Sequence, residues 1–191
     1  MKICVFGAAS DMIDDKYIDR TEQLCYVLAE HGHELVFGAG ANGLMGAAAR
    51  GFKRGGGKIT GIIPEFFKHA TVEPIYDKCD ELIFTDSMRE RKKQMEDRAE
   101  AFIVVPGGIG TLEELFEIIT LKQLAQHKKP IAFYNIYNYY DKLMDFMAHC
   151  ETEKFIREGC HNLYISSDSD SEIINYIEDD KPFELGLKDL K

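Results

Sequence analysis

The sequence predicts an α/β fold in which a doubly wound parallel sheet of six to seven strands is covered by helices on both faces. Short apolar, β-branched runs alternate along the 191 residues with amphipathic segments of helical period. Glycine-rich loops follow several of these runs, and 45% of the residues are hydrophobic, which is enough for one substantial core. Because parallel strands need a crossover between them, strands that alternate with helices predict a parallel sheet.

The elements follow in order along the chain. Strands are expected at residues 2–6, 34–37, 58–63, 81–85, 101–105, 131–135 and 163–166. Helices are expected at 16–31, after the glycines of 38–46, and at 88–99, 112–125, 139–150 and 171–178. Gly32 ends the first helix and Pro64 ends the third strand, whereas 65–80 has no clear period and reads as a loop with local turns. Residues 1–180 are expected to form one domain, and 181–191 a polar tail.

Composition excludes several classes of function. The formal net charge of -10 argues against nucleic acid or an anionic membrane as partner, because such surfaces require a broad basic face. The five cysteines are odd in number and widely spaced, without a CxxC pair, so neither a disulfide framework nor a zinc site is indicated. No apolar run approaches the roughly 18 residues that span a bilayer. A cytoplasmic protein that needs no metal and no cofactor is expected.

The stretch PGGIGTLEE at 106–114 joins an expected buried strand to an expected helix. Gly107, Gly108 and Gly110 let the backbone turn tightly and approach a ligand without intervening side chains. The first amides of the following helix have no intrahelical partner and lie at the positive end of its dipole. This corner therefore suits an anion such as a phosphate.

A second group of candidates lies on the helix that begins near Met88, where Ser87 and Glu90 form a capping-box pattern. At 100° per residue, Lys92 falls on the same stripe as the apolar residues, and Arg91 lies at its edge. For either cation alone, a long stem that carries the charge out to water is the commoner outcome. Near a glycine loop, the two would supply the local positive charge that an acidic chain otherwise lacks.

Glu114 has two interpretations. Thr111-x-x-Glu114 is also a capping-box pattern, in which the glutamate only bonds a backbone amide at the helix start. The same carboxylate would stand one turn from the phosphate-binding amides, where it could act near a reacting carbon. Glu113 lies 100° around the helix and is expected to point elsewhere, so a two-carboxylate glycosidase site is not predicted.

Two other patterns in the sequence favour different functions less strongly. The run from Gly38 to Gly43 matches GxGxxG, with Glu65 as a candidate ribose ligand, and alone it would favour a dinucleotide-binding enzyme. It follows the second strand rather than the first, which lowers the weight of that interpretation. His31 and His33 have no metal-ligand partner at useful spacing and are expected to lie in a solvated turn.

Taken together, four motifs resemble the Lonely Guy (LOG) family of cytokinin riboside 5'-monophosphate phosphoribohydrolases. They are GLMG at 43–46, GIIP at 61–64, MRERK at 88–92 with Met95, and PGGIGTLEE at 106–114 with Thr120. The resemblance runs through nearly the whole chain. It implies a Rossmann-like homodimer, with the site near the interface, that hydrolyses the N-glycosidic bond of a nucleoside 5'-monophosphate.

Carried over by position, the resemblance implies that Arg91 and Glu114 form the catalytic pair. It implies nucleotide contacts for Ser10, Gly40, Gly43, Met88, Lys92, Gly107, Gly108, Gly110, Thr111 and Thr120. The first loop departs from the family pattern, since GAAS keeps only the Ser10 hydroxyl, and the acidic residue expected after Pro64 has Glu73 as its nearest candidate. An adenine-type substrate, AMP or an N6-substituted AMP, is expected. The alternatives are a nucleotide carrier or sensor without turnover and, less favoured, an NAD-dependent enzyme.

Overall fold

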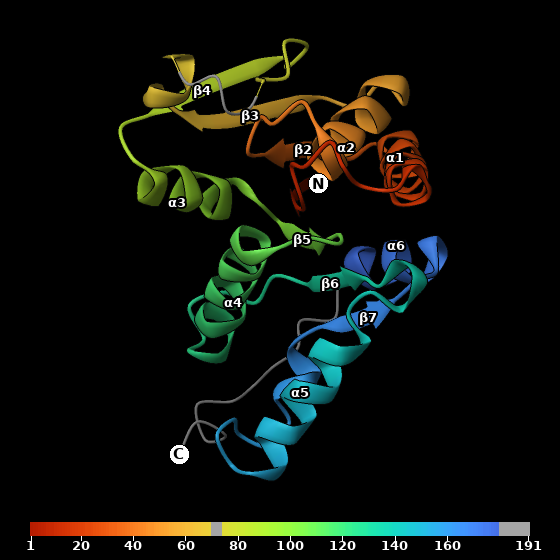
Figure 1. Ribbon diagram of the computed structural model, residues 1–191, viewed down its shortest axis with the longest axis vertical. Helices are drawn as coiled ribbons and strands as arrows, with labels where there is room; N and C mark the ends of the chain where they lie inside the picture. Colours follow the sequence, from red (N-terminus) through yellow and green to blue (C-terminus); the bar gives the residue numbers. More distant parts are fainter. Residues whose placement is uncertain (70–73, 180–191) are drawn as a thin grey trace.

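The computed structural model describes residues 1–69 and 74–179, and in this part of the chain seven parallel strands form one sheet (Figure 1). Their order is β4-β3-β2-β1-β5-β6-β7. The strands are β1 (Lys2–Phe6), β2 (Glu34–Phe37), β3 (Ile59–Pro64), β4 (Glu81–Thr85), β5 (Ala101–Val104), β6 (Ile131–Tyr134) and β7 (Ile165–Ser167). This confirms the predicted doubly wound α/β fold. Glu73 and the tail expected at 181–191 lie outside the described residues.

Helices cover both faces of the sheet. They are α1 (Asp15–Glu30), α2 (Gly43–Arg54), α3 (Met88–Arg98), α4 (Ile109–Gln123), α5 (Asp141–Thr152) and α6 (Asp170–Glu178). The apolar side chains of α1, α2 and α6 pack into one hydrophobic cluster, and those of α3, α4 and α5 pack into a second. The two groups of helices lie on opposite sides of the sheet in Figure 1.

The five inner strands are buried almost throughout, which explains why they read as continuous apolar runs rather than alternating ones. The edge strands β4 and β7 are more exposed. In β1, Ile3 and Val5 belong to the first cluster, while Cys4 and Phe6 belong to the second. Successive side chains of a strand point to opposite faces, so one short run supplies both layers of the core.

Local signals set the ends of two helices that matter for the site. The Ser87 hydroxyl accepts a hydrogen bond from the Glu90 amide at 3.2 Å, and the Glu90 carboxylate accepts one from the Asp86 amide at 3.0 Å. This fixes the start of α3 at Met88, as predicted. Gly32 follows α1 with φ of +82°, a conformation that favours glycine.

The strand order reverses between β1 and β5. From β1 the chain builds outward through β2, β3 and β4, then crosses back to pair β5 against the other side of β1. Ligands of open α/β sheets bind at such a reversal, beyond the carboxyl ends of the strands. Among the described residues, no helix is long and apolar enough to cross a membrane.

Candidate functional site

A cavity of about 400 Å³ opens at the carboxyl edge of the sheet, where the strand order reverses. Loops after three of the strands and the starts of α3 and α4 line it. The predicted site residues that line it are Ser10, Met88, Arg91, Gly108, Gly110, Thr111 and Glu114. Backbone hydrogen bonds hold the loops together: the Ala8 amide donates to the Pro106 carbonyl at 3.1 Å, and the Leu44 amide donates to the Ala8 carbonyl at 2.8 Å.

The PGG corner leaves the start of α4 open toward the cavity. The helix begins at Ile109 with Gly108 as its N-cap, and no side chain caps it. A Cβ at Gly108 or at Gly110 would meet nothing within 4 Å. The helix start therefore presents amides and space together, which is what an anionic group requires.

This start corrects one sequence interpretation of Glu114. A capping box would place Thr111 at the N-cap, but Thr111 is the third residue of the helix, is buried, and caps nothing. The Thr-x-x-Glu spacing matches the motif, but the helix begins at Ile109, three residues too early for the motif to operate. Glu114 therefore projects from within the helix toward the cavity.

Arg91 is the cation inside the site. Its side chain is only 10% exposed, its Nε donates to the Ile62 carbonyl at 3.1 Å, and one Nη donates to the Gly38 carbonyl at 3.3 Å. The other Nη lies 3.6 Å from Oε1 of Glu114. A Cβ on Gly38 would stand 1.6 Å from the guanidinium, so this position must be glycine for Arg91 to lie here.

Glu114 is nearly as buried as its partner, with a side chain 12% exposed. Burial raises the pKa of its carboxyl from 4.5 to about 7, although the charge of Arg91 acts in the opposite direction. Desolvation therefore outweighs the ion pair, which at 3.6 Å is longer than a direct hydrogen bond. A carboxyl with a pKa near neutrality can accept or donate a proton at neutral pH.

Lys92 does not line the cavity beside Arg91. Its ammonium pairs with the carboxylates of Glu113 and Glu117 on α4. Adjacent residues of a helix point about 100° apart, so α3 directs one cation into the cavity and the other toward its neighbour helix. Glu113, expected to point elsewhere, does reach the rim of the cavity while it binds Lys92.

Four other predicted contacts also lie outside the cavity lining. Gly43 has φ of +55°, and a Cβ there would meet the carbonyls of Ala8 and Ser10, so it packs α2 against the first loop. Gly40 forms an isolated bridge with Ile75. Gly107 is closed off by Thr111, whose Oγ1 would lie 2.1 Å from an added Cβ. Thr120 is exposed on α4, where its hydroxyl donates to the Phe116 carbonyl at 2.6 Å.

The backbone of the GxGxxG-like loop is therefore packed against, and hydrogen-bonded to, other parts of the protein. The amide of Ala41 donates to the Pro74 carbonyl at 2.9 Å, and the amide of Tyr76 donates to the Ala39 carbonyl at 2.8 Å. A dinucleotide fingerprint requires these backbone atoms to approach a pyrophosphate. Only Gly38 of this loop lines the cavity, and it does so beside Arg91.

Several residues that shape the site were not singled out from the sequence. The hydroxyl of Tyr139 donates to the Gly107 carbonyl at 2.8 Å, and that of Tyr140 donates to the Val105 carbonyl at 2.8 Å, so the segment after β6 braces the PGG corner. Met45, Ile63 and Phe67 provide apolar lining. Position at a strand end was the available signal for Ile63, whereas the tyrosines carried no signal beyond an aromatic run.

Comparison with known proteins identifies the family of the chain. A family model described as "Possible lysine decarboxylase" matches residues 45–177. The cytokinin riboside 5'-monophosphate phosphoribohydrolase LOG of Oryza sativa subsp. japonica is 36% identical over 189 residues, which cover 97% of this chain and 76% of that protein. A phosphoribohydrolase of the same description from Arabidopsis thaliana is 35% identical over 181 residues, or 95% of this chain and 84% of that protein.

Solved structures share the fold at lower identity. A molybdenum cofactor binding protein from Rippkaea orientalis superposes with a TM-score of 0.69 at 21% identity, covering 93% of this chain and 94% of that one. The molybdenum cofactor carrier protein of Chlamydomonas reinhardtii gives a TM-score of 0.68 at 20% identity, covering 91% and 92%. At such identities the likeness concerns the fold alone. On the sequence matches, the chain belongs to the Lonely Guy family of cytokinin riboside 5'-monophosphate phosphoribohydrolases.

Proposed function

We propose that the protein hydrolyses the N-glycosidic bond of an adenine-type nucleoside 5'-monophosphate, AMP or an N6-substituted AMP, to free base and ribose 5-phosphate. The observation that carries this proposal is the buried pair of Arg91 and Glu114, set one helical turn from the open start of α4. An anion site and a carboxyl with a pKa near neutrality share one cavity. A nucleotide brings its phosphate and its glycosidic carbon to these two groups.

The phosphate is held at the start of α4. The free amides near Gly108 and Gly110, the helix dipole and the open space at both glycines accommodate the three phosphate oxygens. Tyr139 and Tyr140 fix the loop before the ligand arrives, so little ordering is required on binding. Binding energy at the phosphate then aligns the remote glycosidic carbon.

The bond from the ribose carbon to the base breaks with its electron pair leaving on the base, and an oxocarbenium-like ribosyl centre develops. Ionised Glu114 stabilises this positive charge and takes a proton from the attacking water, whose oxygen bonds to the ribose carbon. The base gains a proton as it leaves, so the sum is nucleotide plus water to base plus ribose 5-phosphate. Arg91 favours the ionised form of Glu114 against the opposing effect of burial, and it positions the carboxylate.

The apolar lining suits the base. Met45, Met88 and Phe67 provide the apolar surface of the cavity, and a purine ring buries more area against such side chains than a pyrimidine ring does. This supports a purine. Comparing kcat/KM for AMP and for an N6-substituted AMP measures the preference between the two substrates.

The test is release of base from AMP by the wild type and by Glu114→Gln. Glutamine keeps the shape but cannot ionise, and we expect a loss of kcat of about 10²-fold or more, within the range assigned to a positioned acid or base. Glu117→Gln is the matched control, because this residue lies on the same helix outside the cavity lining. It should retain turnover. A folded Glu114→Gln protein with wild-type kcat would sink the catalytic assignment.

The same assay separates the competing function of a nucleotide carrier or sensor. A carrier would bind AMP saturably and release no base, whatever residue stands at position 114. Saturable binding of NAD in preference to AMP would instead favour the dinucleotide enzyme.

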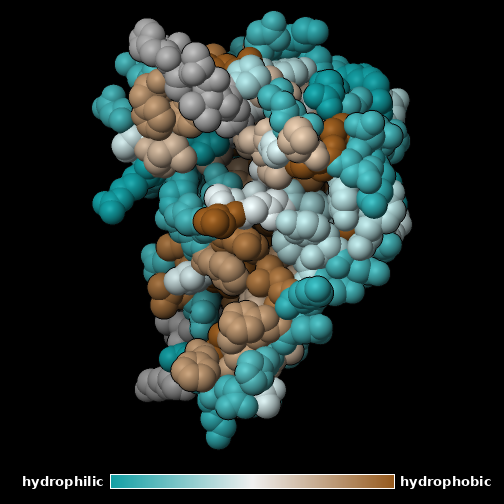
Figure 2. Space-filling view, in the orientation of Figure 1, coloured by the Kyte–Doolittle hydropathy of each residue, from teal (hydrophilic) through white to brown (hydrophobic). Residues whose placement is uncertain are grey.

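We infer that the active form is a homodimer built on α4 and α5. Figure 2 shows apolar residues gathered over these two helices, and the exposed large apolar side chains in and after them include Ile109, Phe116, Leu124, Phe146 and Phe155. Surfaces of this kind mark protein interfaces. Thr120 lies on the exposed side of α4, so its predicted nucleotide contact would be to the cavity of a second copy. A monomeric mass in sedimentation equilibrium would contradict the dimer.

A further inference from the structure

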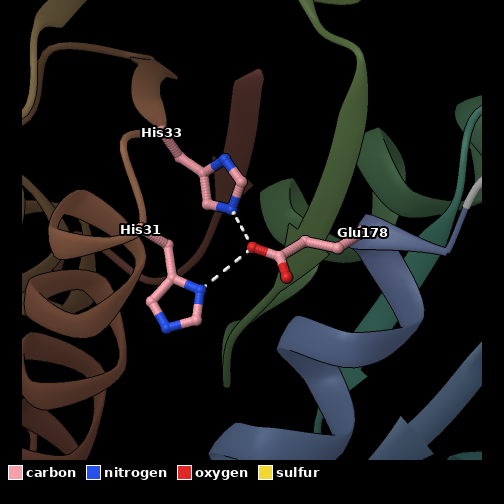
Figure 3. A group of neighbouring side chains, drawn as sticks. All are labelled: His31, His33 and Glu178. Atoms are coloured by element: carbon pink, nitrogen blue, oxygen red, sulfur yellow. Dashed lines mark hydrogen bonds and ion pairs between the residues drawn. The ribbon is translucent and has the colours of Figure 1, made fainter.

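Three potential metal ligands converge at the edge of the sheet opposite the cavity. Figure 3 shows His31 and His33, which follow α1, turned toward the carboxylate of Glu178 at the end of α6. Nδ1 of His31 lies 3.0 Å from Oε1 of Glu178, and Nε2 of His33 lies 2.9 Å from the same oxygen. In the part of the chain that the structure describes, no other group of three histidine, cysteine or carboxylate residues converges in this way.

The backbone explains why two histidines so close in sequence face one carboxylate. Gly32 stands between them with φ of +82°, and its conformation reverses the chain between the end of α1 and the start of β2. The two rings consequently lie 6.3 Å apart, tilted by 32°, rather than on opposite sides of the turn. The sequence-based expectation that they lack a ligand partner is wrong, because the third residue is 145 positions beyond His33.

The donor atoms nearly match a tetrahedral ion. All three lie within 4.8 Å of one another. Bonds of about 2.1 Å to imidazole nitrogen and carboxylate oxygen place tetrahedral ligands about 3.4 Å apart, so the observed contacts would widen by about half an ångström. Rotation of the half-exposed Glu178 side chain supplies such a change. A fourth position faces solvent, since His31 is exposed.

The side chains of the cluster also interact electrostatically. His33 is 7% exposed, and burial together with the nearby Met1 amino group keeps its pKa below the ordinary value, although the Glu178 carboxylate opposes this. Burial favours the protonated form of Glu178, but hydrogen bonds from His31 and His33 outweigh it and lower its pKa.

We propose that His31, His33 and Glu178 form a binding site for a divalent transition-metal ion of the Zn²⁺ class. Two imidazoles and one carboxylate with an open fourth position form a donor set that Zn²⁺ accepts. The Met1 amino group lies 3.3 Å from Nδ1 of His33 and fixes that ring with Nε2 toward the site. The ion would tie the turn after α1 to the end of α6, and so join the first βα unit to the last helix.

This site is separate from the proposed hydrolase chemistry. His31 and His33 precede β2, at the amino edge of the sheet, whereas the cavity lies beyond the carboxyl ends of the strands. The ion would therefore act on stability rather than on turnover. Binding to the folded state alone raises the melting temperature in proportion to the logarithm of the ion concentration above Kd.

The experiment measures Zn²⁺ binding by calorimetry and Co²⁺ binding by visible absorption. The protein carries no histidine tag and begins at Met1, because a tag binds these ions and an extension would displace the amino group beside His33. Three variants are compared: His31→Ala and Glu178→Gln, which remove ligands at half-exposed positions, and His149→Ala, an exposed histidine on α5 outside the cluster. Circular dichroism confirms that each is folded.

The wild type and His149→Ala should bind one Zn²⁺ per chain with equal affinity, and Zn²⁺ should raise the melting temperature of both. His31→Ala and Glu178→Gln should each bind Zn²⁺ at least about tenfold more weakly. Co²⁺ should give the absorption of a four-coordinate nitrogen and oxygen site in the wild type and in His149→Ala only. If the wild type takes up no ion at one-to-one stoichiometry, or if either ligand variant binds within tenfold of His149→Ala, the assignment is overturned.

Discussion

Each end of the strands has a glutamate beside basic side chains, but the pKa of the glutamate is shifted in opposite directions at the two ends. At the carboxyl edge, Glu114 lies beside Arg91 and burial raises its pKa to about 7. At the amino edge, Glu178 accepts from His31 and His33, and these bonds lower its pKa. The difference is water: the Glu114 side chain is 12% exposed and that of Glu178 is 36% exposed. A nearby cation does not by itself keep a carboxylate ionised, because desolvation competes with it.

Removal of the buried Arg91 cation is expected to have the largest effect on stability. Arg91→Met leaves Glu114 buried without a positive charge and leaves the carbonyls of Ile62 and Gly38 without their donor. We expect a destabilisation of about 3 kcal/mol at pH 8, at the low end of the range for broken buried pairs because the site opens onto the cavity. At pH 5 the cost should be much smaller, since a protonated Glu114 needs no counter-charge. Urea unfolding at the two pH values measures it.

A double-mutant cycle supplies the control for that result. Adding Glu114→Gln to Arg91→Met removes the uncompensated charge, so part of the lost stability should return at pH 8. Additive losses from the two single variants would contradict an energetic coupling between the side chains.

The second prediction is that wild-type stability falls with rising pH because of the ionisation of Glu114. The folded-state pKa of Glu114 is raised from 4.5 to about 7, so the folded state holds this proton more tightly than the unfolded chain. Wild-type stability therefore decreases as pH rises from about 4.5 to about 7, by at most about 3 kcal/mol. Glu114→Gln lacks this decrease, and its melting temperature relative to the wild type should rise between pH 5 and pH 8. A constant difference would show that Glu114 ionises as it does in water.

Activity should follow the opposite slope. The ionised carboxylate is the reactive form, so kcat/KM should increase as pH rises through about 7, while stability falls over the same interval. A kcat/KM that is flat between pH 6 and pH 8 would argue against Glu114 as the base.

The smallest effect is expected at the amino edge without metal. Glu178 has a lowered pKa, so its contribution to stability is present above the unfolded pKa and lost as pH falls through the folded one. Glu178→Gln should cost about 0.5 kcal/mol at pH 7 in low salt, because the group is more than a third exposed and screened. The cost should shrink in high salt. In the presence of added Zn²⁺ and without chelator, the stability of Glu178→Gln relative to the wild type should be lower still, because the variant lacks one ligand of the proposed ion.

The sequence was a good guide where the signal was local. Apolar runs located the strands of the sheet, and the Ser87 cap located the start of α3. The glycines marked the turn before α4, which begins at Ile109, three residues before the expected start at 112. The periodicity of α3 placed Lys92 on the apolar stripe and Arg91 at its edge, whereas the structure puts only the Arg91 guanidinium in the cavity. These features depend on neighbours within a few residues, which a single sequence displays.

The features that sequence reasoning missed depend on distant residues. Lys92 turns to α4 because Glu113 and Glu117 stand opposite it there, and this packing is visible only when the helices are placed. The His31 and His33 cluster needs Glu178 from the far end of the chain. The capping-box interpretation at Thr111 failed for a different reason: the pattern is present, but the helix starts at Ile109, so spacing alone could not decide between the two interpretations of Glu114.

The Arg91 guanidinium fills the space beside Gly38, and this restricts which substitutions position 38 can tolerate. A Cβ at residue 38 would lie 1.6 Å from the Arg91 guanidinium, although 53 positions separate the two residues in the chain. A side chain at position 38 and the Arg91 guanidinium would therefore occupy the same volume. Any side chain introduced at position 38 would displace the Arg91 guanidinium. We therefore expect a substitution of Gly38 to be tolerated only in variants in which Arg91 is also replaced.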